Sequence, residues 1–462
     1  MLEQLLNFGR KIIPKPIFNF FQPAYHWFLA MLANLFYGFP SKKLKIIGVT
    51  GTDGKTTTTI FIASILEEAG FKVGLINGLN FKIGDKIWPN NLDVTMAGRF
   101  QLQKLLSQMN KEKCDYVILE VTSEGIAQHR ILGIDFMAAV LTNVSSEHLN
   151  IHKTFENYLR TKGKLFEKLS TQMNTEKNTD EHRKSISVVN IDDKNAGHFL
   201  KFPADEKWGY GVKNQKSKIK NQKLGIKNQE LRVVEAERVE LAKNSSSFMI
   251  HDSCFMIHLL GEYNIYNALA ATTVALALGI NPEQIKKGLE KIKEISGRME
   301  EVKIINGPRV FIDFAHTPQG LEAVFKTAKR INPQGKLITV FGSAGGRDKI
   351  KRPLMGEAAA KIADFTILTT DDPRKEDPKE ICRQIEKGFE KFNKIKNKDY
   401  QIIIDRKEAI ALALKMAKKE DIIIIAGMGA SQWMHLGEKK IPWSDKETAL
   451  LIFEKQLEVN EA

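Results

Sequence analysis

Residues 45–70 read KIIGVTGTDGKTTTTIFIASILEEAG and decide the fold of the first half of the chain. The short apolar run at Lys45–Val49 predicts a buried strand. The stretch Thr57–Gly70 predicts a helix that the glycine ends. A strand that enters a helix through a loop rich in Gly and Thr is typical of an α/β protein that binds phosphate. We therefore expect a mostly parallel, doubly wound sheet around this loop.

The loop GVTGTDGKTT has the residue types that phosphate binding needs. Gly51 and Gly54 allow backbone N–H groups to turn toward phosphates at the N-terminus of the helix. Lys55 supplies positive charge, and the Thr56 hydroxyl can hold Mg²⁺. The general pattern requires glycine where Val49 stands, so the loop is a narrower variant. The predicted nucleotide-binding residues of the loop are Gly51, Thr52, Asp53, Gly54, Lys55, Thr56 and Thr57.

The composition is that of a soluble globular protein with two or three domains, since the 462 residues are 43% hydrophobic and 27% charged. The net charge of +14 does not predict nucleic-acid binding, because neither a zinc-finger spacing nor an RNA-recognition motif accompanies it. The cysteines, Cys114, Cys254 and Cys382, are far apart, which fits a reducing cytoplasm. No signal peptide is evident, and we expect a cytoplasmic monomer.

The segment from Pro16 to Ser41 contains no charged residue and is rich in Phe, Tyr, Trp and Leu, with lysines on both sides. It is long enough to span a bilayer, but polar residues, a glycine and prolines interrupt it. Three interpretations stay open: a helix packed on the next domain, a helix lying on the membrane surface, and a spanning helix. The first is favoured.

Strands and helices alternate along the rest of the chain. Further strands are predicted at Val73–Ile76, Tyr116–Val121, Met137–Leu141, Val310–Phe314, Leu337–Phe341, Phe365–Thr369, Gln401–Ile404 and Asp421–Ala426, and helices at Leu102–Met109 and Gly261–Leu278. The pattern breaks near residue 295. We therefore expect three parts: a short aromatic helical segment (1–44), a central ATP-binding domain with a parallel, doubly wound sheet (45–294), and a C-terminal Rossmann-like domain (295–462).

Two stretches, at about 171–185 and 211–247, are rich in Lys, Asn and Gln and poor in core residues. KNQ recurs at Lys213, Lys220 and Lys227, and FMIH recurs at Phe248 and Phe255, each with a spacing of seven. A heptad coiled coil has this period, but the repeated units are few and mostly polar. A surface insertion, as a short hairpin or a disordered loop, is the favoured interpretation.

Motifs along residues 45–458 resemble those of the Mur ligases, most closely the branch that adds the third residue of the peptidoglycan stem peptide. In family order they are GVTGTDGKTTT, EVTSEGIAQHR, TNVSSEHLNIH, LRTKGKLF, GEYNIYNALAA, GRME, DFAHTP, GSAGGRDKIKRPLMG, TTDDPRKEDP and DRKEAI. The resemblance implies an ATP-dependent, ADP-forming ligase. In this family a substrate carboxylate is phosphorylated by ATP, and an amine attacks the acyl phosphate. Metal ions offset the charge of the γ-phosphate and the carboxylate in such chemistry.

The resemblance also implies which residues bind metal and act with Lys55 in catalysis. Glu120 ends a strand beside the phosphate loop, where a metal ligand is expected, and His148 in SSEHLN is a second ligand. Lys162 in RTKGKLF matches the lysine that the family carbamylates, a change that lets it hold another Mg²⁺; Lys164 is the competing lysine. The implied metal ligands are Thr56, Glu120, His148 and Lys162, with ATP and Mg²⁺ as cofactors.

Residues that hold the nucleotide and the peptide-bearing substrate are implied in the same way. Asn264 and Asn267 are implied to face the adenine, Arg298 and Asp313 to reach the nucleotide from the C-terminal domain, and Thr95, Thr122, Gln128 and Arg130 to hold the substrate. Arginine suits an anionic group, whereas His316 in DFAHTP is expected to be structural. The family's Thr-Thr-Pro is Thr95-Met96-Ala97 here, and its Ser-Ser-His is Thr122-Ser123-Glu124.

The incoming amino acid is implied by the stretch Asp371-Asp372-Pro373-Arg374, which resembles the DNPR signature of diaminopimelate-adding enzymes. Arg347 lies 24 residues before Asp371, as the family's carboxylate-binding arginine does. Two arginines suit a second carboxylate, which lysine lacks. However, Asp372 replaces Asn, and the family's GKGHE is GMGAS from Gly427 onward. Diaminopimelate is the first interpretation, and lysine or another amino acid is the alternative.

The front of the chain departs most from the family, because only 47 residues precede the loop. The usual N-terminal domain, which holds the uridine nucleotide, is longer, so we expect that it is missing. The first hypothesis is a ligase for a UDP-linked muramoyl dipeptide. Alternatives are a ligase for another carrier, such as a lipid-linked one docked through residues 16–41, and a nucleotide-binding module without turnover. Folylpolyglutamate synthase shares the ATPase core, but the DDPR and GRDKIKRP motifs disfavour it.

Overall fold

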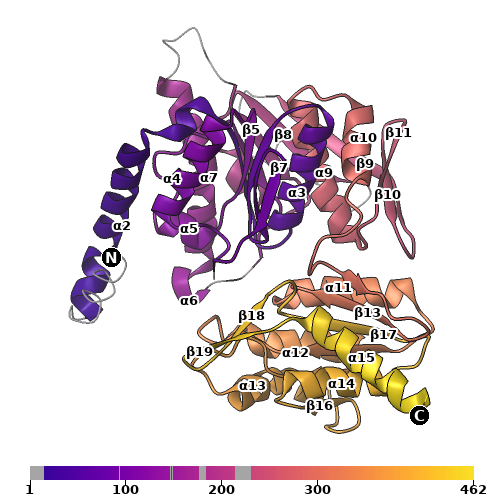
Figure 1. Cartoon of the computed structure of the whole chain (residues 1–462). Helices are drawn as coiled ribbons and strands as arrows, with labels where there is room; N and C mark the ends of the chain where they lie inside the picture. Colours follow the sequence, from indigo (N-terminus) through magenta and orange to yellow (C-terminus); the bar gives the residue numbers. More distant parts are fainter. Residues whose placement is uncertain are drawn as a thin grey trace. The chain divides into compact units, whose positions relative to one another are not determined.

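A computed structural model of the chain describes residues 15–92, 94–145, 147, 149–175, 184–213 and 230–461. The chain divides into two compact units (Figure 1). The first unit comprises Met1–Val144, Glu156–Glu235 and Leu269–Gly288, and the second comprises Ser145–Phe155, Ala236–Ala268 and Leu289–Ala462. Strands alternate with helices in both, so the predicted α/β class is confirmed.

The helices are α2 (Lys15–Tyr37), η1 (Pro40–Lys43), α3 (Lys55–Glu68), α4 (Arg99–Lys111), α5 (Ser123–Ala127), α6 (Leu149–His152), α7 (Phe155–Thr175), α8 (Ala196–Leu200), α9 (Glu262–Ala277), α10 (Pro282–Glu290), α11 (Pro318–Ile331), α12 (Lys351–Ile362), α13 (Pro378–Glu390), α14 (Arg406–Met416) and α15 (Asp445–Glu461). The strands are β1 (Lys45–Thr50), β2 (Val73–Ile76), β3 (Asn80–Ile83), β4 (Lys86–Pro89), β5 (Tyr116–Glu120), β6 (Ala138–Leu141), β7 (Ile186–Asn190), β8 (Glu206–Val212), β9 (Leu231–Leu241), β10 (Ser246–Ile250), β11 (Ser253–Ile257), β12 (Glu300–Val302), β13 (Arg309–Asp313), β14 (Leu337–Phe341), β15 (Phe365–Leu368), β16 (Tyr400–Ile402), β17 (Ile422–Ala426), β18 (Trp433–Leu436) and β19 (Lys439–Pro442).

The first sheet has the order β11-β10-β9-β8-β7-β6-β1-β5-β2-β3-β4. Strand β1 lies between β5 and β6 and is parallel to both, with Val49 opposite Glu120 and Thr50 opposite Leu141. Strands β5 and β6 are buried along their whole length, as expected for parallel strands covered on both faces. The register brings the carboxyl ends of the three strands to one edge of the sheet, where the phosphate loop follows β1.

The second sheet has the order β12-β13-β17-β14-β15-β16, in which all strands but β12 are parallel. Neighbouring residues of β13 enter different cores: Phe311 packs with Phe325 of α11, whereas Val310 and Ile312 pack with Ile410 of α14. Side chains alternate between the two faces of a strand, so helices cover this sheet on both sides. The five strands predicted after residue 295 are confirmed, with ends shifted by no more than two residues.

The FMIH repeat forms a β-hairpin, and the heptad interpretation is wrong for it. Phe248 of β10 is the antiparallel partner of Phe255 of β11, and the two rings stack with centroids 5.4 Å apart. The spacing of seven therefore comes from two short strands and a turn. Residues 231–247 contain β9 and the start of β10, which are antiparallel partners, so of the two expected forms this part has the hairpin and not the disordered loop. Residues 176–183 and 214–229, with most of the KNQ repeats, lie outside the described residues.

The aromatic segment at the front forms helix α2, which packs on α4 in the first unit (Figure 1). Ala30 and Ala33 are buried, and the side chain of buried Asn34 donates to Leu132 O at 2.8 Å. Within the described residues, no helix is both long and apolar enough to cross a membrane. The expected packing of this segment on the following domain is confirmed for one face of the helix.

Candidate active site

The phosphate loop is held tightly against the strand ends beside it. A Cβ atom on Gly51 would lie 1.8 Å from Thr142 Oγ1, so glycine is the residue that fits there. Gly54 has φ of 81° and precedes α3, a backbone conformation that glycine adopts without strain. Asn143, in the TNVSSEHLN motif, fixes the tip of the loop, because its Oδ1 accepts from Asp53 N at 3.0 Å and its Nδ2 donates to Asp53 O at 3.1 Å. The sequence interpretation assigned no role to Asn143.

The predicted metal ligands Thr56 and Glu120 lie together at the start of α3. The Thr56 hydroxyl donates to Glu120 Oε2 at 2.8 Å, and the backbone N–H of Gly78 donates to the same oxygen at 2.9 Å. Glu120 is 2% exposed. Lys55 Nζ donates to the Thr52 carbonyl oxygen at 2.8 Å, which keeps the cation at the loop. The site thus combines a buried carboxylate, a hydroxyl and a lysine at a helix N-terminus.

Lys162 of α7 reaches the same loop, although it is more than a hundred residues away in sequence. It is 1% exposed, its Nζ donates to Gly51 O at 2.6 Å, and it lies 4.6 Å from the centroid of the Tyr158 ring. The Tyr158 hydroxyl is hydrogen-bonded to Thr52 Oγ1 at 3.1 Å. Lys164, the competing lysine, is exposed. Tyr158 was missed, and its lack of a motif left no signal in the sequence.

Only three of the four predicted metal ligands, Thr56, Glu120 and Lys162, are among the described residues. His148 lies outside the described residues. Among the residues that are described, no group of three or more His, Cys, Asp and Glu side chains forms a metal site. Thr56 and Glu120 nevertheless provide the oxygen donors that Mg²⁺ prefers, and Thr57, the next residue of α3, is buried.

The residues predicted to hold the peptide-bearing substrate surround α5. Thr122 caps this helix, accepting from Gly125 N at 3.1 Å. Arg130 donates through Nε and Nη2 to Gln128 Oε1, at 3.2 and 2.8 Å, and through Nη1 to the carbonyl oxygen of Met96. Burial lowers the pKa of Arg130. Met96 is 1% exposed, so the departure from Thr-Thr-Pro places a core side chain beside α5. Thr95 lies next to Gly78, whose neighbours include Glu120 and Thr56.

The residues predicted to hold the nucleotide from the second unit surround the start of α9. Asn264 and Asn267 are buried and hydrogen-bonded to each other, Asn267 Nδ2 donating to Asn264 Oδ1 at 3.0 Å. Asp313, at the end of β13, accepts from Met299 N and Ala315 N, both at 2.7 Å. Arg298 lies over the Phe314 ring at 4.6 Å. His316, expected to be structural, is hydrogen-bonded to Phe314 O.

The predicted amino-acid site lies at the carboxyl ends of β14 and β15. Asp372 Oδ2 accepts from Arg374 Nε at 3.0 Å, and Asp372 Oδ1 accepts from the backbone N–H of His435 at 2.8 Å. His435 Nδ1 is also 3.0 Å from Asp372 Oδ1. A Cβ atom on Gly345 would lie 1.9 Å from Pro373 O, so the loop that carries Arg347 lies directly against DDPR. His435 comes from the β18–β19 hairpin, and no motif indicated it.

Asp371 and Gly427 lie side by side above a buried arginine. A Cβ atom on Gly427, whose φ is 107°, would lie 2.4 Å from Asp371 Oδ2. Burial raises the pKa of Asp371 to about 6. Arg406, the arginine of DRKEAI, is buried and binds Asp445 through two hydrogen bonds of 2.7 and 2.8 Å. It also donates to the carbonyl oxygens of Thr370 and Ala426, and thereby fixes the backbone before Asp371 and Gly427.

A second buried arginine ties together the loops that carry Arg347 and Arg374. Arg352, fully buried in α12, donates to both oxygens of Glu376, at 2.9 and 3.2 Å. Glu376 Oε1 also accepts from Gly346 N at 2.6 Å. The hydrogen bonds from Arg352 lower the pKa of Glu376 to about 2. The two loops are therefore connected by a charge-assisted network.

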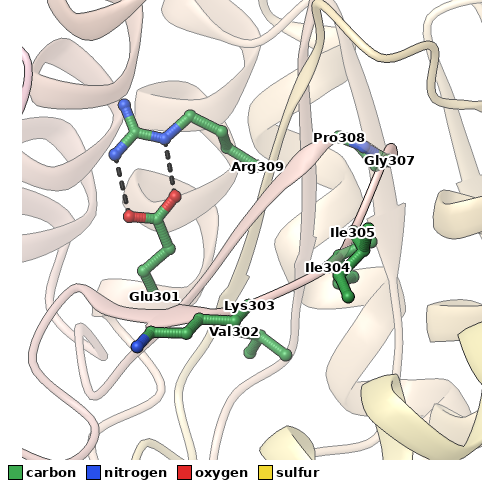
Figure 2. A pocket seen from close by; sticks show the side chains of 8 residues that line it. All are labelled: Glu301, Val302, Lys303, Ile304, Ile305, Gly307, Pro308 and Arg309. Carbon is green, nitrogen blue, oxygen red and sulfur yellow. Dashed lines mark hydrogen bonds and ion pairs between the residues drawn. The ribbon is translucent and has the colours of Figure 1, made fainter.

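A cavity of about 310 Å³ lies in the β12–β13 hairpin, away from these residues. Figure 2 shows two of the lining side chains, Arg309 and Glu301, pointing toward each other and joined by two hydrogen bonds of 2.7 and 2.9 Å. None of the predicted site residues lines this cavity. The proposed chemistry therefore does not involve it.

Comparisons with known proteins find similar sequences along most of the chain. The Mur ligase middle domain matches residues 49–275, and the Mur ligase, glutamate ligase domain matches residues 297–429. The chain is 39% identical over 428 residues to the UDP-N-acetylmuramoyl-L-alanyl-D-glutamate--2,6-diaminopimelate ligase 1 of Clostridium acetobutylicum, covering 91% of this chain and 80% of that protein.

Solved structures of several ligases are similar to the chain. A UDP-N-acetylmuramoyl-L-alanyl-D-glutamate--2,6-diaminopimelate ligase is 28% identical with a TM-score of 0.56, and the match covers 90% of this chain and 79% of that one. The folylpolyglutamate synthase of Mycobacterium tuberculosis is 14% identical with a TM-score of 0.64, over 86% of this chain and 91% of that one. At that identity, the second match shows a shared fold alone.

Proposed function

Because the chain belongs to the Mur ligase family and is an ATP-dependent, ADP-forming ligase, we propose that it adds diaminopimelate to a muramoyl-alanyl-glutamate precursor. The observation that carries this proposal is the similarity along 91% of the chain to a ligase named for that reaction. We propose a cytoplasmic location, because ATP and nucleotide-linked precursors are cytoplasmic. A lysine-adding enzyme, or one that acts on a lipid-linked precursor, is the alternative.

In the proposed reaction, the precursor carboxylate takes the γ-phosphoryl group of ATP and becomes an acyl phosphate. The amino group of the incoming amino acid then attacks the acyl carbon and displaces phosphate, while its proton passes to solvent. The N–H groups of the phosphate loop and Lys55 bind and orient the phosphates. Thr56 and Glu120, with His148, would hold Mg²⁺, which supplies positive charge against the phosphoryl oxygens and the carboxylate.

We propose further that Lys162 carries a carbamate. A fully buried lysine is costly as an ammonium, and Lys162 lies beside a loop that binds anions, with one backbone oxygen and an aromatic ring among its contacts. A carbamate, formed when Nζ attacks CO₂ and loses a proton, turns the side chain into an anion that can bind a second Mg²⁺. The Nζ atom of Lys162 lies 2.6 Å from Gly51 O, which is part of the phosphate loop.

The test of the carbamate compares Lys162→Ala with Lys164→Ala, a change on the exposed side of the same helix. Protein equilibrated with ¹³C-bicarbonate should show a carbamate NMR signal that Lys162→Ala loses and Lys164→Ala keeps. Activity should disappear with Lys162→Ala and return in part with added short carboxylic acids. A fully active Lys162→Ala variant would refute the role.

We propose that the amino-acid site recognises the distal carboxylate and the distal ammonium of diaminopimelate together. Arg374 and Arg347 provide cations for the carboxylate. Asp372 provides a carboxylate next to Arg374, in a chain whose GMGAS stretch lacks the family's acid. A zwitterionic end thus meets groups of both signs, whereas the end of lysine presents only an ammonium.

The decisive experiment measures phosphate release from purified protein with ATP, Mg²⁺, UDP-muramoyl-Ala-Glu and one amino acid at a time. Diaminopimelate should give release, and lysine should give little. Release with lysine but not with diaminopimelate would overturn the assignment of Arg374. Absence of release with every amino acid, followed by release with a lipid-linked precursor, would replace the UDP-linked carrier by the lipid-linked one.

A further inference from the structure

Helix α2 exposes a row of large apolar side chains along its outer face. Within the described part of the chain, the exposed apolar residues of this helix are Phe21, Trp27, Phe28, Met31, Leu32, Leu35 and Phe36. Leu35 and Phe36 are 68% and 73% exposed, and Phe28 is 59% exposed. At 100° per residue these positions cover about half of the helix circumference. Scattered apolar side chains are ordinary on protein surfaces, but a continuous apolar face indicates a binding partner.

The opposite face of α2 is fixed to the first unit, so the exposed face cannot turn inward. His26, Ala30, Ala33 and Asn34 are buried on that side. Asn34 Nδ2 donates to Leu132 O at 2.8 Å. After the helix, Ser41 Oγ donates to Gly133 O at 2.9 Å. These hydrogen bonds anchor the C-terminal half of α2 beside α4 (Figure 1).

The charged residues in the stretch of sequence that contains α2 are all of one sign. No Asp or Glu occurs from residue 4 to residue 52, whereas Arg10, Lys11, Lys15, Lys42, Lys43 and Lys45 fall within the same stretch. Lys42, Lys43 and Lys45 are exposed just beyond the C-terminal end of the helix. Lysines beside an apolar face are attracted to anionic lipid headgroups. A helix that combines a Trp- and Phe-rich apolar face with flanking lysines and no acidic residue has the composition of a helix that lies on an anionic membrane surface.

We infer that the outer face of α2 lies flat in the headgroup region of an anionic bilayer. The helix is about 34 Å long at 1.5 Å per residue, and its buried side stays on the protein, so the bilayer contacts only the exposed side. Aromatic side chains enter the boundary between headgroups and acyl chains, and the lysines contact lipid phosphates. This inference does not depend on the proposed reaction, since it concerns where the chain works and not what it joins.

The test is flotation of the full chain with lipid vesicles, which gives a partition coefficient. Vesicles with phosphatidylglycerol should carry the protein, and vesicles of phosphatidylcholine alone should carry far less. High salt should weaken the binding, because it screens the lysines. Changing Lys42 and Lys43 together to Gln should reduce partitioning to anionic vesicles by about fivefold per lysine.

The apolar contribution is tested with the double variant Phe28→Ser and Leu35→Ser, which should reduce partitioning at least about tenfold. The matched control changes Ile305 and Leu451 to Ser, since these side chains are 78% and 57% exposed in the second unit. The control should bind like the wild type. Thermal unfolding should be similar for all three proteins, because every changed side chain is exposed.

The fluorescence of Trp27, which is 47% exposed on the outer face of α2, measures whether this face enters the lipid. The difference between wild type and Trp27→Phe isolates its emission from the other tryptophans, and this emission should shift to the blue and lose acrylamide quenching when vesicles are added. Three results would overturn the inference: no flotation with anionic vesicles, equal flotation of the Phe28/Leu35 variant, or Trp27 already shielded without lipid. A dimer in solution that the same double variant dissociates would assign the face to a second copy instead.

Discussion

Replacement of Glu376 by Gln should weaken the second unit in a manner that depends on pH. The carboxylate accepts from Nη1 and Nη2 of Arg352 and from Gly346 N, and Arg352 is fully buried. Gln keeps the shape but removes the charge, so Arg352 loses its ionic partner in a buried position. Removal of one partner of a buried ion pair is more costly than the pair itself is stabilising.

The expected loss of unfolding free energy follows from the pKa of Glu376, which the hydrogen bonds from Arg352 lower from 4.5 to about 2. At about 1.36 kcal/mol per unit, this shift corresponds to at most about 3 kcal/mol. The Glu376 side chain is 22% exposed, so solvent screening lowers the expected loss to about 1–2 kcal/mol. Because the folded-state pKa is depressed, the stabilisation is complete above pH 4.5 and is lost as pH falls toward 2.

Scanning calorimetry of the wild type and of Glu376→Gln between pH 7 and pH 3.5 measures the difference in their melting temperatures. Near pH 7 the variant's second unit should melt about 2–8 °C lower, at about 2–4 °C per kcal/mol for a unit of this size. The difference in melting temperature should become smaller below pH 4.5, because the wild type then loses the stabilisation from the Glu376 carboxylate. The control Glu438→Gln removes the exposed partner of Lys375 and should leave the melting temperature unchanged. If the difference in melting temperature between wild type and Glu376→Gln stays constant with pH, the ionic explanation is refuted. If it is no larger than the difference for the control, the Arg352–Glu376 pair does not stabilise the unit.

Two further substitutions test the phosphate and amino-acid sites. Gly427→Ala places a Cβ atom 2.4 Å from Asp371 Oδ2 at φ of 107°, so calorimetry should show a loss of about 1–3 kcal/mol and kinetics a raised KM for the amino acid. Gly279→Ala, with φ of 78° but no neighbour within 4 Å, should cost about 1 kcal/mol from backbone strain alone and leave KM unchanged; equal effects would contradict a role for the contact. Thr56→Val removes the hydroxyl beside Glu120 and should lower the apparent Mg²⁺ affinity of phosphate release about 10–100-fold, whereas Thr56→Ser should restore it. An unchanged Mg²⁺ dependence of Thr56→Val would exclude Thr56 as a ligand.

The parts of the site that follow from local pattern could be predicted from the sequence. The phosphate loop and Glu120 each lie at the end of a short apolar run, and parallel strands bring such ends to one sheet edge. The proximity of Lys162 to the loop depended on the family resemblance, since helix periodicity does not say which strand end a helix faces. Tyr158 and His435 could not be found, because their contacts join segments far apart in sequence. The FMIH repeat left a heptad open as an alternative, because a period of seven is shared by a heptad and by a tight hairpin.

The departure at Asp372 and the contact with His435 have one physical explanation. A carboxylate in place of Asn lies beside Asp371, and its charge adds to the burial that raises the pKa of Asp371 to about 6. Such a like charge is unfavourable unless other groups offset it. Arg374 donates to one oxygen of Asp372, and the His435 backbone N–H donates to the other, with His435 Nδ1 at 3.0 Å. The β18–β19 hairpin thus stabilises the acid that we propose binds the distal ammonium, so Asp372→Asn should raise KM for diaminopimelate and shift the preference away from it.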